Sequence, residues 1–257
     1  MLNAAGVEAF NKKIIAASPT VYDMAAYPKT LSGKTVATYV NTHTDLSDEL
    51  YREGKLVSDN YKNILRSQTN AAAIPAEVTV RYGVTVRRAN LRNLPTGEGL
   101  FFYASDRNFD ALQETALDPG EAVAILHTST NGYFYYVQAY NYRGWLSKFD
   151  VAETDRSTWL RYAEPKNFLT VVAKDYTLKA DGAQVLFQQG TRLQLADKKA
   201  SAYTVKVPVR TKEGKLQEEK VVLAANASLH EGYLPYTTNN IIRSAFKFYD
   251  SVYGWGR

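Results

Sequence analysis

The chain has 257 residues and a formal net charge of +5, with 45% hydrophobic and 22% charged residues. This balance is that of an ordinary folded globular protein and excludes a long disordered chain. No stretch approaches the ~20 consecutive apolar residues of a membrane-spanning helix. The start, "MLNAAGVEAF", lacks the basic and apolar regions of a secretion signal.

The sequence contains no cysteine, which excludes disulfides, thiolate metal sites and cysteine nucleophiles within the chain. The three histidines, His43, His127 and His230, are scattered, whereas a metal site needs clustered ligands. No G-x-S-x-G pattern supports serine catalysis. We therefore predict no catalytic residue, no metal site and no cofactor in this chain.

The basic residues form no run longer than two, so the positive charge indicates solubility rather than a nucleic-acid surface. A mild basic excess also suits anionic lipid or an anionic wall polymer. The 19 tyrosines favour strands, and their rings with polar tips suit shallow sites for sugars and peptides.

Residues 1–75 are predicted to form a mostly helical segment that packs on the β-rich region after it. Apolar spacing predicts a helix over 4–17. Prolines and a glycine make 18–33 an extended, irregular connector. Helical spacing returns over 42–68, where Gly54 divides two predicted helices.

From Val78 the apolar period changes to two, which predicts strands over 76–155. Turns are expected at Pro119–Gly120, at Asn131–Gly132 and near Asn141. About five short strands with polar turns make a small barrel.

A long loop is predicted between Leu94 and Leu117, and loops of this length in compact domains are usually functional. The aromatic run Tyr133–Tyr136 alternates across a strand, so two rings face a core. The other two rings are expected either to pack at a contact between domains or to line a ligand groove. Trp145 is interpreted as barrel core rather than as a ligand platform.

A second β-rich region is predicted over 165–235, with a linker at 159–166. In 236–257 a helix is expected, with Thr238 or Asn239 as its cap. One apolar stripe on this helix needs a partner surface. It contains Ile241, Ile242, Ala245, Phe246 and Tyr249.

Several segments resemble one protein family. "RRANLRNLPTGEGLF" resembles the opening of a bacterial SH3 (SH3b) barrel, with Arg92 and Pro95 in the usual places. "LDPGEAVAILHTSTNGYFYYVQAYNYRGWLSKFDVA" resembles its remaining strands, which end in Gly144–Trp145. "SPTVYDM" and "YPKTLSGKTV" fit an N-terminal segment. In this order they resemble NlpC/p60-type cell-wall peptidases with an N-terminal clip and two SH3b domains.

The resemblance implies a mainly β fold with two small SH3-like barrels, preceded by a helical N-terminal clip and followed by one C-terminal helix. It assigns 1–75 to the clip, or stabilising segment, 76–155 to the first SH3b domain and 165–235 to the second. Residues 236–257 are then the first helix and the start of a missing peptidase domain.

In the family, a "YGWGG" turn precedes "DCSG", whose cysteine is the nucleophile at a helix N-terminus. Here the turn reads "YGWGR" and ends at Arg257, so the resemblance implies truncation before the catalytic cysteine. The chain is then not an enzyme but the targeting and substrate-restricting part of a γ-D-glutamyl-diamino acid endopeptidase. Its implied partners are the peptidoglycan stem peptide and the missing peptidase domain, in the cell envelope, periplasmic or extracellular.

In such peptidases the long loop of the first SH3b domain leans over the catalytic cleft. Aromatic rings there would pack on peptide methyls, and an aspartate would pair with a peptide amine. The alternative is a loop folded on its own aromatics. The candidate ligand-binding residues are Phe101, Tyr103, Ser105, Asp106, Asp110 and Gln113.

Two other interpretations stay open. In the first, the chain is a stand-alone SH3b binding protein of the envelope, although an uncovered apolar helix face argues against this interpretation. An enzyme in its own right would require hydrolysis of wall peptide by the isolated chain. The interpretation as part of a peptidase predicts a frayed final helix with fast amide exchange across 240–250.

Overall fold

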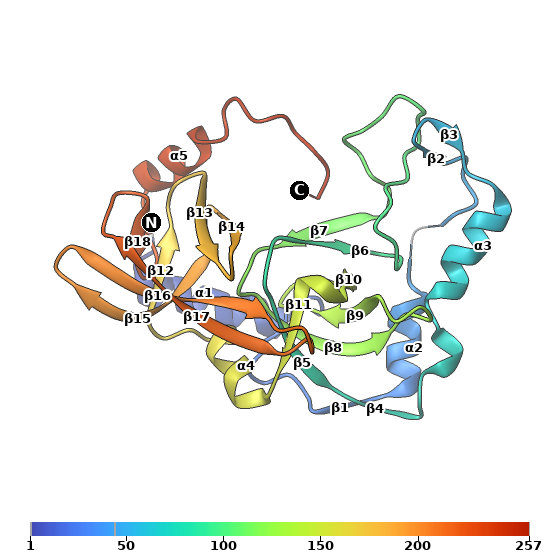
Figure 1. Cartoon of the computed structure of the whole chain (residues 1–257), viewed down its shortest axis with the longest axis horizontal. Helices are drawn as coiled ribbons and strands as arrows, with labels where there is room; N and C mark the ends of the chain where they lie inside the picture. The colour runs from blue at the N-terminus through green and yellow to red at the C-terminus, as the bar shows by residue number, and fades with distance from the viewer. Residues whose placement is uncertain (1, 44, 257) are drawn as a thin grey trace.

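The computed structural model describes residues 2–43 and 45–256, in which strands dominate and five α-helices occur (Figure 1). This confirms the predicted mainly β fold with helices at both ends. None of these helices is long and apolar enough to cross a membrane. The helices are α1 Ala4–Ala17, α2 Gly33–Asn41, α3 Asp59–Gln68, α4 Arg156–Ala163 and α5 Thr238–Phe246.

The first β region forms a seven-stranded antiparallel sheet in the order β11-β5-β8-β9-β10-β6-β7. Gly120 and Gly132 adopt positive φ angles of 88° and 70°, which confirms the predicted turns. The strands are β5 Arg81–Thr85, β6 Ala89–Arg92, β7 Gln113–Leu117, β8 Ala122–Thr128, β9 Phe134–Gln138, β10 Arg143–Ser147 and β11 Val151–Thr154.

Strand β8 is apolar on both faces, so the sheet packs against a core on each side. Val123 and Ile125 point into an inner core. Ala122, Ala124 and Leu126 point the other way into an outer core. Alternate residues of a strand face opposite sides of the sheet, so both faces must be covered.

The outer core is covered by segments from before and after the sheet. Val36 and Val40 of α2 are fully buried there. Trp159 and Tyr162 of α4 pack into the same core. Trp145 is fully buried, as predicted, but it lies in this outer core rather than on the inner face of the sheet.

Part of the N-terminal segment packs on the first sheet, as predicted, although no residue of α1 is buried. Strand β1 (Thr30–Ser32) pairs with β4 (Glu77–Thr79), and the amide of Gly33 donates to Ala76 O at 2.7 Å. A Cβ at Gly33 would lie 1.9 Å from Pro75 O, so only glycine permits this close approach.

The prediction of two helices over 42–68 is wrong in its first half. A hairpin, β2 Tyr51–Arg52 with β3 Lys55–Leu56, turns at Glu53 and Gly54, both at positive φ. Thr44, which the prediction includes, lies outside the described residues. The helically spaced leucines instead join a separate small core with residues of the long loop. That core contains Leu46, Leu50, Val57, Leu65, Leu94, Leu100 and Leu112.

The second β region forms a five-stranded sheet in the order β17-β16-β15-β12-β18, with a separate hairpin β13–β14. Both enclose one apolar core that includes Leu169, Phe187 and Val207. The strands are β12 Phe168–Val171, β13 Asp175–Ala180, β14 Ala183–Gln188, β15 Arg192–Lys199, β16 Ala202–Arg210, β17 Leu216–Ala224 and β18 Leu229–Glu231.

The segment interpreted as a linker is largely the helix α4, which packs on the first sheet. The two β regions also touch directly. Glu153 N donates to Gly214 O at 2.8 Å, and Arg210 Nε donates to Val151 O at 3.1 Å. Strand β11 therefore contacts the end of the β16–β17 hairpin.

Helix α5 is capped by Thr237, whose hydroxyl accepts from Asn240 N at 3.2 Å, one residue before the predicted cap. None of its residues is buried. Phe246 is 68% exposed, and Tyr249 just beyond the helix is 80% exposed. The predicted apolar stripe is therefore uncovered in the described part of the chain.

Replacing Trp159 by alanine is expected to lower the free energy of unfolding by about 3–5 kcal/mol. The indole is fully buried, packs 4.9 Å from the Tyr82 ring and donates to Val123 O at 3.1 Å. Urea unfolding measures the loss. Val222→Ala on β17 is the control, because this exposed side chain should change stability by less than about 0.5 kcal/mol. A Trp159→Ala loss as small as the control would contradict the packing of α4 in the outer core.

Candidate functional site

The long loop (residues 93–112) joins β6 to β7 and lies on the small leucine core beneath it. Phe101 pairs with Tyr51 of the β2–β3 hairpin through two main-chain hydrogen bonds of 2.7 and 2.9 Å. Figure 1 shows the loop beside this hairpin at one edge of the molecule. The N-terminal segment therefore fixes where the loop lies.

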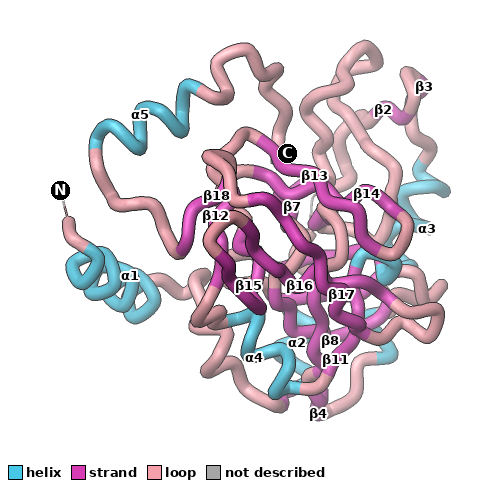
Figure 2. Tube along the Cα trace, turned by 60° about the vertical axis from the view of Figure 1, so that its left-hand side comes forward, coloured by secondary structure: helices cyan, strands magenta, loops and turns pink. Residues whose placement is uncertain are grey.

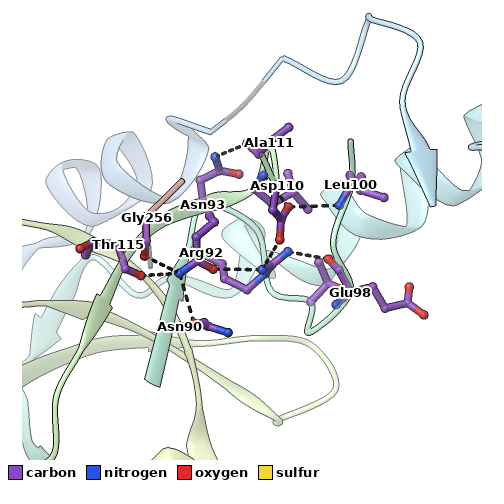
Figure 3. A network of polar contacts seen from close by, with 12 residues as sticks. Asn90, Arg92, Asn93, Glu98, Leu100, Asp110, Ala111, Thr115 and Gly256 are labelled. Atoms are coloured by element: carbon purple, nitrogen blue, oxygen red, sulfur yellow. Dashed lines mark hydrogen bonds and ion pairs between the residues drawn. The ribbon is translucent and has the colours of Figure 1, made fainter. Parts of the chain in front are cut away.

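A buried ion pair anchors the loop to the end of β6. Arg92 Nη1 lies 2.7 Å from Asp110 Oδ2, and both side chains are buried (Figure 3). The same guanidinium donates to Glu98 O and to Gln113 Oε1. A charge removed from water is tolerated only when it is paired and hydrogen-bonded in this way.

Asp110 and Gln113, both predicted to bind ligand, are engaged within the protein. Asp110 Oδ1 also accepts the amides of Leu100 and Leu112, at 3.1 and 3.0 Å. Gln113 Nε2 donates to Thr115 O at 2.7 Å and to Gly256 O at 3.1 Å. Their observed contacts hold the loop in shape, and we interpret both as positioning residues.

The tip of the loop is open to solvent. Tyr103 is 72% exposed, and Ser105 is exposed beside it. Asp106 Oδ1 accepts the amides of Asn108 and Phe109, and the Asn108 amide holds the pKa of this carboxyl below its usual value. Asp106 therefore closes a turn that presents the aromatic rings.

Two exposed aromatic residues of the loop, Phe102 and Phe109, were not among the predicted site residues. The loop has no repeating pattern of apolar and polar residues, so its sequence does not indicate which aromatic rings point outward. Tyr103 and these two phenylalanines form the accessible aromatic surface of the loop. Phe101, by contrast, is half-buried.

Between the loop and the β2–β3 hairpin lies a pocket of about 660 Å³, the loop pocket. Tyr61 donates to Glu98 Oε2, and together with the Arg52 guanidinium 2.9 Å away it holds the pKa of Glu98 below its usual value. The pocket thus offers charges of both signs. Its charged lining residues are Arg52, Glu53, Arg88, Arg92, Glu98, Arg107 and Asp110.

The "YGWG" turn near the C-terminus lies on the long loop. The Tyr253 and Phe109 ring centroids are 5.9 Å apart, and Trp255 N donates to Asn108 O at 2.9 Å. Gly256 has φ +63°, and a Cβ there would lie 2.7 Å from Gln113 Cγ. Figures 1 and 2 show the chain leaving α5 and arching over to this place. Arg257, on which the predicted truncation rests, lies outside the described residues.

The aromatic strand β9 packs on both of its faces. Tyr136 is buried in the outer core, where its hydroxyl donates to Tyr39 O at 2.9 Å, and Phe134 packs against the same core. Tyr135 packs against the inner core and donates to Glu153. Tyr133, just before β9, is the most exposed of the four aromatic residues.

No three His, Asp or Glu side chains within residues 2–43 and 45–256 are grouped so as to hold a metal ion. His127 is partly buried against the Trp145 ring, with Nε2 3.0 Å from Asn70 O. Burial lowers the pKa of His127, which favours a neutral imidazole in a packing role.

Comparisons with known proteins agree with this architecture. A family model described as an SH3 domain (SH3b1 type) matches residues 100–147, from the long loop to the end of β10. Among solved structures, the chain is similar to a novel NlpC/P60 endopeptidase from Photobacterium damselae subsp. piscicida, with a TM-score of 0.63 and 18% identity. No curated protein matches the chain.

The structural similarity covers 87% of this chain and 58% of the solved endopeptidase chain. The chain thus contains an SH3b-type region and shares the fold of part of an NlpC/P60 enzyme. At this level of identity the similarity establishes the fold alone.

Asp110→Ala is expected to cost about 3–5 kcal/mol of unfolding free energy, because it leaves the Arg92 guanidinium buried without its carboxylate. Asp106→Ala, in the same loop but only partly buried and in no ion pair within the described residues, is the matched control and should cost less than about 1 kcal/mol. Chemical unfolding compares the two. Adding Arg92→Met to the Asp110 variant should recover part of the loss. Equal effects of the two aspartates would contradict the anchoring role.

Proposed function

We propose that this chain is the non-catalytic, wall-binding part of a peptidoglycan endopeptidase and that the long loop contacts the stem peptide. The observation that carries the proposal is the anchored loop, which holds exposed aromatic rings beside a pocket of mixed charge. The SH3b match over 100–147 includes most of this loop.

The chemistry of the loop suits a short peptide. Exposed rings of Phe102, Tyr103 and Phe109 offer apolar area to methyl groups at low entropic cost. The loop pocket beside them contains both guanidinium and carboxylate groups, which suit the carboxylates and amines of a stem peptide. A surface that presents both features favours a peptide over a neutral sugar.

Anchoring favours binding because a fixed loop loses little freedom when the ligand arrives. The Arg92–Asp110 pair holds the base of the loop, and Phe101 is tied to Tyr51. The exposed rings thus stand on a preorganised support. In this proposal Asp110 and Gln113 shape the site, and Tyr103, Ser105 and Asp106 at the tip face the peptide.

Catalysis would come from elsewhere, since the chain has no cysteine. We place the nucleophile on a peptidase domain that packs on the exposed face of α5 and on the "YGWG" turn. The proposed units are the clip 1–75, SH3b domains 76–155 and 165–235, and the start of the peptidase domain in 236–257. The corresponding location is the cell envelope.

A stand-alone envelope binding protein is the second candidate. It is favoured by the docking of the "YGWG" turn on the loop, through Trp255 N to Asn108 O, which needs no further domain. The two candidates differ in whether α5 requires a covering partner.

Tyr103→Ala is expected to weaken binding to purified peptidoglycan sacculi by roughly five- to tenfold, as loss of an exposed aromatic contact does. Co-sedimentation of the full chain with sacculi measures this. Tyr236→Ala, an exposed tyrosine outside the loop, is the control and should bind like the native chain. Native-like binding by the Tyr103 variant, or no binding by the native chain, would overturn the proposed function.

In the isolated monomer, amide hydrogens across 240–250 should exchange fast, because no residue of α5 is buried. Buried strands such as β8 serve as the slow reference within the same sample. Hydrogen–deuterium exchange followed by mass spectrometry measures both. A purified NlpC/P60 domain added in excess should slow exchange in α5 if it covers that face. Slow exchange in the monomer alone would favour the stand-alone protein.

A further inference from the structure

A second pocket, of about 700 Å³, lies at the junction of the two β regions. It shares no lining residue with the loop pocket. We call it the junction pocket. Its lining side chains include Glu121, Tyr140, Tyr162, Arg192 and Tyr233, with Ile14 and Ile15 of α1 at the rim.

Glu121 presents an unpaired carboxylate to this pocket. The residue is half-buried just before β8, and within residues 2–43 and 45–256 no hydrogen bond or ion pair reaches its side-chain oxygens. Burial raises the pKa of Glu121; the charge of Arg192 opposes this rise, and that of Asp118 adds to it. Ionising a carboxyl group held in this way costs stability, and the charge of Arg192 offsets that cost only in part.

Arg192, at the start of β15, brings the opposite charge to the same pocket. Its Nη1 donates to the Tyr233 hydroxyl at a long 3.3 Å. Its charge acts on Glu121, yet the described part of the chain shows no ion pair between the two. A guanidinium from the second β region and a carboxylate from the first therefore face one pocket without closing on each other.

Aromatic and aliphatic side chains form much of the remaining wall, which Asp23 and Glu164 also line. Tyr140 and Tyr233 are 51% and 65% exposed, while Tyr162 is buried with its hydroxyl 3.1 Å from Glu218 Oε1. Tyrosine rings attract a cationic ammonium group. Ile14 and Ile15 project from α1, which Figure 2 shows at the edge of the molecule, and offer apolar contact to a methylene chain.

We propose that the junction pocket binds a free α-amino-acid head group, with its ammonium on Glu121 and its carboxylate on Arg192. Such a head group carries both charges on one carbon, so it offers one partner to each of the two opposite charges that line this pocket. Arginine binds a carboxylate through two parallel hydrogen bonds. The ammonium supplies the partner that Glu121 lacks.

Free amino acids and the side-chain end of a diamino acid in a peptide both present this group. The identification of the natural ligand as a wall peptide rests on the proposed function. The recognition of an amino-acid head group by the junction pocket does not. A diamino acid would also lay its methylene chain along Ile14 and Ile15.

The test is calorimetric titration of the full chain with four related compounds. 2,6-Diaminopimelate and lysine contain the head group and should bind. 1,5-Diaminopentane retains the amines alone, and heptanedioate retains the carboxylates alone; both should bind at least tenfold more weakly. Equal binding of either single-charge compound would overturn the proposal, as would no binding of all four at millimolar concentration.

Glu121→Gln should lower the affinity for 2,6-diaminopimelate at least tenfold and raise Tm at pH 7. The pKa of Glu121 is raised in the folded state, so its ionised form disfavours folding, and removing the charge stabilises. Glu213→Gln, an exposed carboxylate in the β16–β17 turn, is the control and should change neither property. Unchanged affinity in the Glu121 variant would overturn the proposal. If this variant does not fold, the four-compound comparison on the native chain still decides.

Sacculus co-sedimentation separates this inference from the proposed function. Loss of 2,6-diaminopimelate binding in Glu121→Gln with sacculus binding retained supports two separate sites. A native chain that binds the amino acid but not sacculi supports the junction pocket and refutes wall binding.

Discussion

The two apolar faces of β8 are the constraint on which the rest of the structure depends. Val123 and Ile125 pack inside the first sheet, and Ala124 and Leu126 pack outside it. A small open sheet cannot leave such an outer face in water. Residues of α2 and α4 cover it, and Trp159 of α4 is fully buried against the sheet. Because α4 leads directly into β12, the same contact places the second β region.

The segment that covers the outer face also sets the position of the candidate site. After α2 the chain continues into the β2–β3 hairpin and α3, which contact the long loop through Tyr51 and Tyr61. The loop is therefore bound on one side by the N-terminal segment and at its base by Arg92 and Asp110. The first sheet, its loop and the part of the N-terminal segment from α2 to α3 are thus joined by shared apolar cores and main-chain hydrogen bonds.

The strands and turns of the first β region were predictable because local chemistry determines them, as at Gly120 and Gly132. The β2–β3 hairpin was not, because Leu46 and Leu50 just before it are spaced like the leucines of a helix but pack in one core with residues of the loop. The Arg92–Asp110 pair joins residues 18 apart through a loop without a repeating pattern, so it is visible only in three dimensions. The sequence predicted that a long loop lies here, but not which of its side chains point outward.

Two polar clusters of opposite character define what the structure can do. At Arg92, the two terminal nitrogens of the guanidinium contact Asp110, Gln113 and the Glu98 carbonyl, while Nε has no hydrogen-bond partner among the described residues, and this ion-paired network anchors the loop. At Glu121, an unpaired carboxylate is kept half-buried opposite a guanidinium that does not reach it. A buried charge with an ion-pair partner specifies structure, whereas a carboxyl group without one is retained at a cost in stability, which is more frequent at functional sites. This difference, rather than pocket size, distinguishes the anchor of the long loop from the proposed binding site at the junction of the two β regions.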